Sequence, residues 1–217
     1  SLIGGPSQSD TWEWDGTDWT QIATPQNAGA RGRYGAAFDI GRGRTVIYGG
    51  VASTQLLGAL SGTWEYDGTT WTQRTTAHSP GALQDPAMCF DPFRQRVVLF
   101  GGSNPFNGAN NATWLYDGVD WTQVATTGTR PSARAQARMF FDSVRGRCVL
   151  FGGGDNFANW LGDTWSFDGT SWTQEGGLAP TARLAHAVAF DTQLGQGVLF
   201  GGLEQSGPSA ATWVYDG

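Results

Sequence analysis

The sequence contains no lysine, only two histidines and two cysteines, and charged residues make up just 15% of its 217 residues. All 13 cationic residues are arginines, and the net charge of −6 leaves no cationic surplus to displace counterions from a phosphate backbone. No stretch approaches the roughly 18 consecutive apolar residues that span a bilayer, and no signal peptide is visible. We therefore expect neither nucleic-acid binding nor membrane insertion.

Glycine and tryptophan are abundant instead, with 33 and 11 residues, a composition opposite to that of disordered chains. One pattern of Thr, Trp, any residue, an aromatic, Asp and Gly occurs five times. A period of about 50 residues indicates a repeat architecture. The tryptophans of the pattern are Trp12, Trp64, Trp114, Trp165 and Trp213, at intervals of 52, 50, 51 and 48 residues.

Each repeat contains four strand-like runs, which in the third complete repeat are residues 135–142, 147–151, 164–168 and 171–175. Their lengths suit strands rather than helices, and Gly, Asp and Pro between them favour turns. Continuous apolar runs such as residues 97–100 predict sheets covered on both faces. Asp-Gly pairs predict tight hairpins between the last two runs, because glycine supplies a positive φ. These pairs lie at 15/16, 67/68, 117/118 and 168/169.

Nine of the eleven tryptophans occupy two recurring positions, which we interpret as packing between neighbouring repeats. A binding platform would not need the same aromatic residue in every repeat. Trp160 lies outside both series. The second series consists of Trp19, Trp71, Trp121 and Trp172.

Further features recur in register with the tryptophans. A di-glycine follows an apolar strand, and a tryptophan follows the aromatic-x-aromatic-Asp strand by seven residues. An arginine opens three repeats, at Arg31, Arg134 and Arg183, whereas Leu83 departs from this pattern. With these features the chain resembles the kelch-repeat family over nearly its whole length. The resemblance implies an all-β propeller of four-stranded antiparallel blades, with the first strand of each repeat innermost. The di-glycines lie at 49/50, 101/102, 152/153 and 201/202.

The repeats define about five blade positions in a single domain, of which three are complete and two are partial. Three interpretations stay open: a small propeller with imperfect end blades, a four-bladed ring closed by pairing of the two ends, or an excerpt of a larger propeller. We favour the excerpt, because the repeat pattern starts and stops abruptly. The blade positions are approximately 1–23, 31–75, 83–125, 134–175 and 181–217.

The loops between the second and third strands are the strongest candidates for a binding surface. Antiparallel strand order places them on the same face as the links between blades, and we call this the loop face. These loops vary while the strands repeat, which is typical of recognition loops on a rigid scaffold. Phe106, Phe157 and Trp160 are off-pattern aromatics that either contact a ligand or cap their own blades. The loops cover residues 51–62, 103–112, 154–163 and 203–211.

The innermost strands add Tyr34, Arg138 and His186, which are placed to line a central channel. Arg138 stands where other repeats have glycine or alanine, so it is a candidate for ligand binding, with a buried ion pair as the alternative. The repeating arginines that open the repeats are expected to be structural, donating hydrogen bonds to carbonyls that link the blades.

Residues for catalysis or metal binding are scarce. His78 and His186 fall in non-adjacent blades without metal-ligand spacing, and no base for a serine nucleophile is evident. The copper ligands of galactose oxidase-like kelch enzymes cannot be placed. We predict no metal and no cofactor. Paired acids for glycoside hydrolysis remain an alternative, since Asp155, Asp163 and Glu204 occupy the loop face.

The two cysteines, Cys89 and Cys148, are too few for a disulfide scaffold and occupy different positions in their repeats. They do not form an evident pair, and we expect two buried free thiols. The absence of lysine, the repeated Trp-x-Tyr-Asp-Gly strands and the lack of disulfides suggest a bacterial protein, secreted or at the cell surface, although the kelch resemblance leaves the compartment open.

The leading hypothesis for function is a non-catalytic recognition scaffold that binds a protein or a glycan through the loop face. The second is a structural or assembly module whose open blade edges pair with another chain, self-association included. The third is a carbohydrate-active enzyme. The fold resemblance does not decide among them, because function depends on the site rather than on the scaffold.

Overall fold

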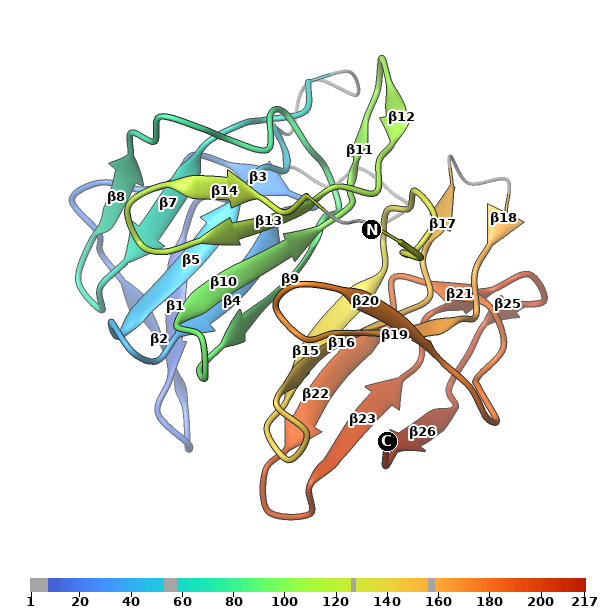
Figure 1. Ribbon diagram of the computed structural model, residues 1–217. Coiled ribbons are helices and arrows are strands. Elements are labelled where there is room, and N and C mark those ends of the chain that lie inside the picture. The colour runs from blue at the N-terminus through green and yellow to red at the C-terminus, as the bar shows by residue number, and fades with distance from the viewer. Residues whose placement is uncertain (1–7, 53–57, 126–127, 156–158) are drawn as a thin grey trace.

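The computed structural model describes residues 8–52, 58–125, 128–155 and 159–217, and all regular structure within them is β-strand. Three four-stranded antiparallel sheets, blades 1 to 3, repeat along the chain with the same strand order, as the repeats predicted (Figure 1). Blade 1 consists of β4 (Gly35–Asp39), β5 (Arg44–Tyr48), β7 (Thr63–Tyr66) and β8 (Trp71–Arg74), blade 2 of β9 (Ala87–Asp91), β10 (Arg96–Phe100), β13 (Thr113–Tyr116) and β14 (Trp121–Gln123), and blade 3 of β15 (Arg138–Asp142), β16 (Arg147–Phe151), β19 (Thr164–Phe167) and β20 (Trp172–Glu175).

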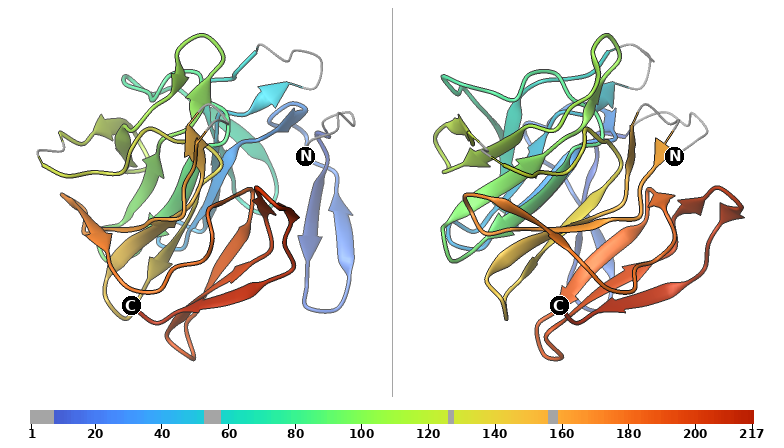
Figure 2. Two further views of the ribbon diagram at one scale, coloured as in Figure 1. Left: turned by 90° about the vertical axis from the view of Figure 1, so that its right-hand side faces the viewer. Right: turned by 45° about the vertical axis from the view of Figure 1, so that its right-hand side comes forward.

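An incomplete sheet lies at each end of this series. Blade 4 has three strands, β22 (Ala187–Asp191), β23 (Gln196–Phe200) and β26 (Thr212–Tyr215), and a hairpin of β1 (Thr11–Trp14) and β2 (Trp19–Ile22) precedes blade 1. Figure 2 shows this hairpin at the margin of the molecule. Within the described residues β1 pairs with β2 alone and β26 with β23 alone. The sheets therefore do not close, and the four-bladed ring closed by pairing of the ends is wrong.

The first strands of the four blades form the inside of the arc, because β4 packs on β9, β9 on β15 and β15 on β22. At one end of the blades, two-residue strands pair the segments that link successive blades with the loops that follow the second strands. Residues Gln84 and Ser103, and likewise Ala135 and Gly154, form equivalent bridges. Links and loops thus share a face, as predicted. The short strands are β3 (Arg31–Gly32), β6 (Val51–Ala52), β11 (Ser103–Asn104), β12 (Gly108–Ala109), β17 (Gly154–Asp155), β18 (Asn159–Trp160), β21 (Arg183–Leu184), β24 (Leu203–Glu204) and β25 (Gly207–Pro208).

The strand predicted for residues 135–142 is split in the structure. Strand β15 begins only at Arg138, because Gln136 has a φ of 59° and turns the chain away from an extended course. Ala135, before this turn, pairs with the loop at Gly154 instead. The apolar pattern of the run gave no sign of the turn.

The Asp-Gly pairs form the expected hairpin turns between the third and fourth strands. In blade 1 the Oδ1 atom of Asp67 accepts hydrogen bonds from the backbone N–H groups of Thr69 and Thr70, each at 2.9 Å. Gly68 has a φ of 93°, a conformation that a side chain would strain. The same two features recur at Asp117 and Asp168, so each turn fixes the register of the strand that follows it.

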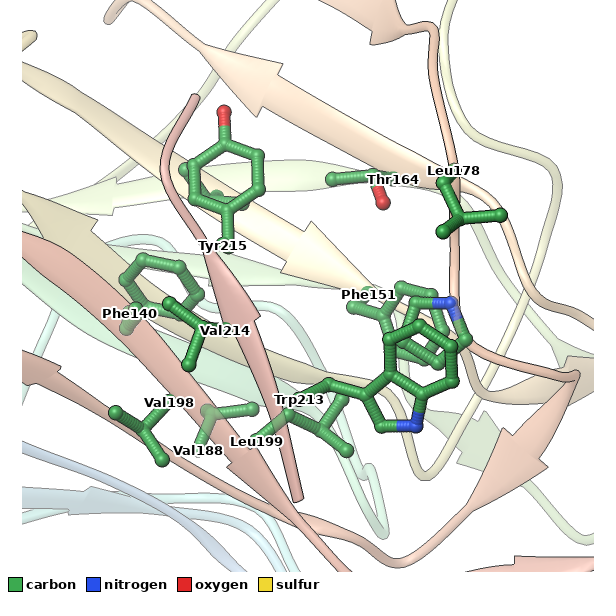
Figure 3. A pocket seen from close by; sticks show the side chains of 13 residues that line it. Phe140, Phe151, Thr164, Leu178, Val188, Val198, Leu199, Trp213, Val214 and Tyr215 are labelled. Carbon is green, nitrogen blue, oxygen red and sulfur yellow. The ribbon is translucent and has the colours of Figure 1, made fainter. Parts of the chain in front are cut away.

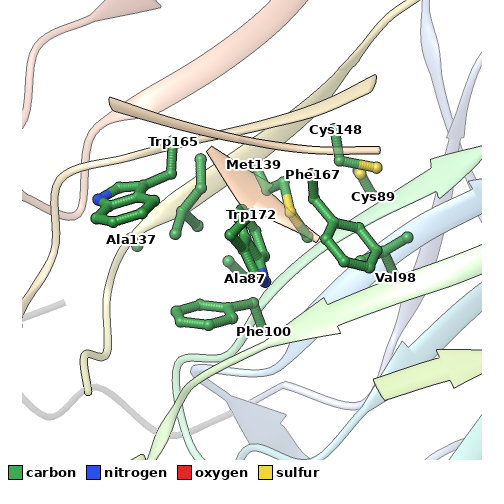
Figure 4. Close-up of a cluster of buried hydrophobic side chains, with 11 residues drawn as sticks. Ala87, Cys89, Val98, Phe100, Ala137, Met139, Cys148, Trp165, Phe167 and Trp172 are labelled. Atoms are coloured by element: carbon green, nitrogen blue, oxygen red, sulfur yellow. The ribbon is translucent and has the colours of Figure 1, made fainter. Parts of the chain in front are cut away.

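Between the complete blades the recurring tryptophans pack as predicted, whereas Trp12 and Trp19 of the first hairpin are 49% and 59% exposed. Trp172 of blade 3 is 5% exposed and lies with Phe100 of blade 2 in one buried cluster, which also contains Trp165, Phe167 and Val98 (Figure 4). Burial of rings of this size is the largest apolar contribution that a single residue makes to a core. Contacts between successive blades, rather than within one sheet, therefore contribute much of the core.

Both cysteines are free and buried, as expected. They also lie next to each other, Cys89 on β9 of blade 2 and Cys148 on β16 of blade 3 (Figure 4). Their different positions in the repeat gave no sign of this contact, which arises because the innermost strand of one blade packs against the second strand of the next. Burial, followed by the hydrogen bond with Cys89, raises the pKa of Cys148 well above its usual range.

We expect neither thiol to react with a thiol reagent such as Ellman's reagent in the native protein, because the thiolate is the reactive form and burial suppresses it. In denaturant both thiols should react at once. A Val119→Cys variant is the control, since that side chain is 75% exposed and its thiol should react in the native state. Immediate loss of a native thiol from the wild-type chain would contradict the burial of both cysteines.

Candidate functional site

On the loop face, the residues that precede the innermost strands surround the central axis, and we call this region the axial end. Backbone hydrogen bonds connect it from one blade to the next. The N–H of Asp85 donates to the carbonyl of Arg33 at 2.7 Å, that of Gln136 to Asp85 at 3.1 Å, and that of Ala185 to Gln136 at 3.3 Å. All four residues have φ between 51° and 59°, in the left-handed region that side chains disfavour. Each costs conformational energy, and the ladder of hydrogen bonds keeps them in place.

The arginines that open the repeats stabilise the same end of the blades. The Nη1 atoms of Arg31, Arg134 and Arg183 donate to the carbonyls of Gly49, Gly152 and Gly201 at 3.1, 3.1 and 2.9 Å, eighteen residues further along the chain in each case. The predicted structural role of these arginines is confirmed. They hold the di-glycine where the second strand ends and the loop begins.

The acids proposed for glycoside hydrolysis are engaged in other contacts. The Asp163 carboxylate accepts two hydrogen bonds from Arg134, at 2.6 and 2.9 Å, and Glu204 forms an ion pair with Arg183 at 2.7 Å. Asp155 accepts hydrogen bonds from the backbone and side-chain amides four residues further on, at 2.9 and 3.0 Å.

The pKa values of these acids are also unsuited to proton donation. Hydrogen bonds from Asn159 lower the pKa of Asp155, and a hydrogen bond from Ser209 is the main cause that lowers the pKa of Glu204. Burial raises the pKa of Asp163, but its hydrogen bonds with the neighbouring arginine outweigh this and the net shift is downward. A general acid in glycoside hydrolysis needs a raised pKa instead.

Arg138, the first residue of β15, and His186, which immediately precedes β22, lie near each other in blades 3 and 4. The His186 side chain is 2% exposed, its ring lies 5.4 Å from that of Phe151, and neither ring nitrogen has a hydrogen-bond partner among the described residues. Burial, followed by the charges of Arg138 and Arg183, lowers the pKa of His186 to about 3. The imidazole is therefore neutral at pH 7, with one donor and one acceptor unused.

The guanidinium of Arg138 is half-buried and, in the part of the chain that the structure describes, has no carboxylate within ion-pair distance. Its hydrogen bond is to the adjacent backbone, from Nη1 to the carbonyl of Ala137 at 3.2 Å. Burial lowers the pKa of Arg138, and the charge of Asp85 partly offsets this. Asp85 itself is neutralised by Arg33, whose Nε lies 2.7 Å from its Oδ2. The buried-ion-pair interpretation of Arg138 is therefore wrong.

The other predicted site residues are spread over the loop face. Phe106 is 78% exposed in the turn between β11 and β12, and Tyr34 is 45% exposed on the link into blade 1. Trp160 is half-buried on β18, where it pairs with Gly154. Phe157 lies outside the described residues. Figure 1 shows the β11–β12 and β17–β18 hairpins projecting from the same end of the blades.

Sequence reasoning missed the axial residues Arg33, Asp85 and Gln136. One signal was available, since their repeat position varies in every blade although it lies two residues after a nearly constant arginine. Among the described residues no three His, Cys, Asp or Glu side chains gather as metal ligands would. Within the same ranges no helix is long and apolar enough to cross a membrane.

The family model described as the KLHDC2/KLHL20/DRC7 Kelch-repeats domain matches residues 92–217, more than half of the chain. No curated protein matches it.

Proposed function

Since this chain belongs to the kelch-repeat family, whose repeats generally mediate protein–protein interaction without catalysis, we propose that it is a protein-binding scaffold that engages its partner at the loop face. The partner segment carries an acidic side chain that binds Arg138 at the axial end of that face. Phe106 provides an apolar contact at the rim.

The unpaired guanidinium of Arg138 is the observation that supports this proposal most. A half-buried cation without a counter-charge is costly, and an incoming carboxylate that forms two hydrogen bonds to it would recover that cost. The neighbouring His186 imidazole is buried and neutral, so Arg138 is the group there that an incoming carboxylate would meet. The net charge of −6 repels an acidic segment from most of the surface. The positive charge of Arg138 attracts such a segment locally and so orients it toward the axis.

The assignment can be tested by selecting binders from a displayed library of random peptides on the immobilised chain. We expect the selected peptides to be enriched in Asp and Glu, and their affinity to fall at least about 30-fold for Arg138→Ala, since loss of one partner of a desolvated charge pair costs 2–5 kcal/mol. Blades 2 and 4 already have alanine at this position, Ala87 and Ala187, so the variant should fold normally.

Arg96→Ala is the matched control, because this arginine opens the second strand of blade 2 at the opposite end of the blade. It should leave peptide affinity unchanged. Selected peptides without acidic enrichment, or equal binding to Arg138→Ala and wild type, would refute the axial site. A glycan that binds through Phe106 alone would appear as carbohydrate binding lost in Phe106→Ala and kept in Arg138→Ala.

A further inference from the structure

One contact recurs at the interfaces between successive blades. It joins the third residue of an innermost strand to the second residue of the second strand in the next blade. Between blades 1 and 2 these residues are Ala37 of β4 and Val97 of β10, and Ala37 packs against the buried cluster that contains Val97. Between blades 3 and 4 they are Phe140 of β15 and Gly197 of β23, where a Cβ atom on the glycine would collide with the Phe140 ring.

The side chains at this contact are complementary in size. Phe140 reaches from blade 3 into blade 4, where its ring lies 5.9 Å from those of Phe190 and Tyr215, and the residue it faces is a glycine (Figure 3). A small side chain, Ala37, faces the larger Val97. The contact is therefore a fixed feature of the interface between blades, and the residues that fill it differ from one interface to the next.

Between blades 2 and 3 the same contact consists of two cysteines, Cys89 of β9 and Cys148 of β16. Figure 4 shows their sulfur atoms directed at each other, in agreement with the hydrogen bond between the two thiols. Cys148 is 0% exposed and Cys89 is 7% exposed, and both belong to one buried cluster. Two thiols that face each other across an interface can be joined by a single S–S bond without a third group.

We propose that Cys89 and Cys148 are the site of a disulfide that joins blade 2 to blade 3 when the chain folds in the presence of a small disulfide such as oxidised glutathione. The Cys89 thiolate attacks one glutathione sulfur, forms a mixed disulfide and releases one reduced glutathione. The Cys148 thiolate then attacks the Cys89 sulfur and releases the second. One S–S bond forms for the one that breaks, and the two thiol protons end on the two released glutathione molecules.

The exchange takes place while blades 2 and 3 come together, because both thiols are buried once the interface is complete. The disulfide closes a loop of about 60 residues between the two cysteines, and closing a loop of this length restricts the unfolded chain strongly. It stabilises the contact between two blades rather than a single sheet. The inference does not depend on the binding function proposed above.

The experiment measures cross-linking in glutathione buffers, starting from the reduced 217-residue chain unfolded in urea. One series is equilibrated after dilution into native buffer and the other in urea, and mass spectrometry gives the cross-linked fraction after free thiols are alkylated. The value of [GSH]²/[GSSG] at half cross-linking should be at least about 30-fold higher in native buffer, because the fold holds the two thiols together. An equal or lower value in native buffer would overturn the proposal.

The product identifies the bond. Trypsin cleaves after arginine, so the cross-link should join residues 75–94 to residues 148–183, and reduction should release the two peptides. The intact chain should keep the mass of a monomer, lower by two hydrogen atoms than that of the reduced chain. A disulfide between two chains, seen as a doubled mass, or a stable glutathione adduct in place of the cross-link would contradict the assignment.

Thermal unfolding tests whether the disulfide fits the interface. The oxidised chain should have a Tm about 4–16 °C above that of the reduced chain. The double variant Cys89→Ala, Cys148→Val has the residue types of Ala37 and Val97 at the equivalent contact, so it should fold and show the same Tm in both buffers. A wild-type Tm that is unchanged or lowered by oxidation would mean that the contact does not hold the disulfide geometry.

A variant that moves one cysteine to the other face of blade 2 is the matched control. Val97 occupies the position in blade 2 that Cys148 has in blade 3. It belongs to the cluster shared with blade 1, whereas Cys89 belongs to the cluster shared with blade 3. The variant Cys148→Val, Val97→Cys keeps two cysteines but places them on opposite faces, so cross-linking should gain nothing in native buffer over urea. A gain as large as in the wild type would show that the contact between blades is not its cause.

Discussion

Replacing Trp121 with alanine is expected to lower the free energy of unfolding by about 3–5 kcal/mol, which is a large part of the total for a single domain. The Trp121 ring is 1% exposed and contacts Tyr116 and Tyr48 from two different blades. Removal would leave a cavity at the interface of blades 1 and 2 and an unused hydroxyl acceptor on Thr63. Urea unfolding followed by tryptophan fluorescence measures the difference.

Trp19→Ala is the matched control for this prediction. Trp19 occupies the same position of the repeat, but it is 59% exposed and packs on Trp14 alone among the aromatic rings described. We expect this variant to cost less than about 1 kcal/mol, because little apolar surface returns to water. Equal destabilisation by both substitutions would mean that the position itself, rather than burial between two blades, determines stability.

Replacing Arg134 with leucine is the second change with a large expected effect, a loss of about 2–4 kcal/mol, since one partner of a buried ion pair is removed. The Arg134 side chain is 0% exposed and Asp163 only 24%. Besides the two bonds to Asp163, Arg134 donates to the carbonyls of Gly152 and Ser132 at 3.1 and 3.0 Å. The variant leaves the partly buried Asp163 carboxylate without its counter-charge, although Trp165 Nε1–H still donates to it at 2.6 Å, and removes a donor from the carbonyl of Gly152.

The double variant Arg134→Leu, Asp163→Ala should recover much of this loss. Blade 2 already has Leu83 and Ala112 at the same two positions, and Leu83 is 4% exposed within the core, so the fold accommodates the apolar pair. A double-mutant cycle by urea unfolding gives the coupling between the two residues. A double variant no more stable than Arg134→Leu would show that the carbonyl contacts, rather than the ion pair, account for the loss.

The pH dependence gives a second measure of the same pair. The net shift of the Asp163 pKa is downward from its ordinary value of 3.8, so the unfolded chain binds the proton more readily than the folded one. The pair therefore stabilises the fold fully above that value, and the contribution is lost as the pH falls below about 4. The slope of stability against pH in this window should be smaller in the double variant than in the wild type.

Much of the architecture was determined by the sequence alone. The 48- to 52-residue period, the Asp-Gly hairpins and the recurring tryptophans predicted antiparallel four-stranded blades packed through aromatic rings. These features are local and repeated, because a hairpin turn depends on the φ of Gly68 and its equivalents, and a strand depends on its own residues. The shared positions of Arg31, Arg134 and Arg183 likewise predicted their hydrogen bonds to the blade-linking carbonyls.

Only the tertiary structure decided how the blades meet. The contact of Cys89 with Cys148, the unpaired state of Arg138 beside His186, and the left-handed turn at Gln136 all depend on which residues of one blade face the next. Each of these positions follows from packing between segments about 50 residues apart. A repeat pattern specifies the strands of each blade, whereas the contacts between blades depend on residues at which the repeats differ.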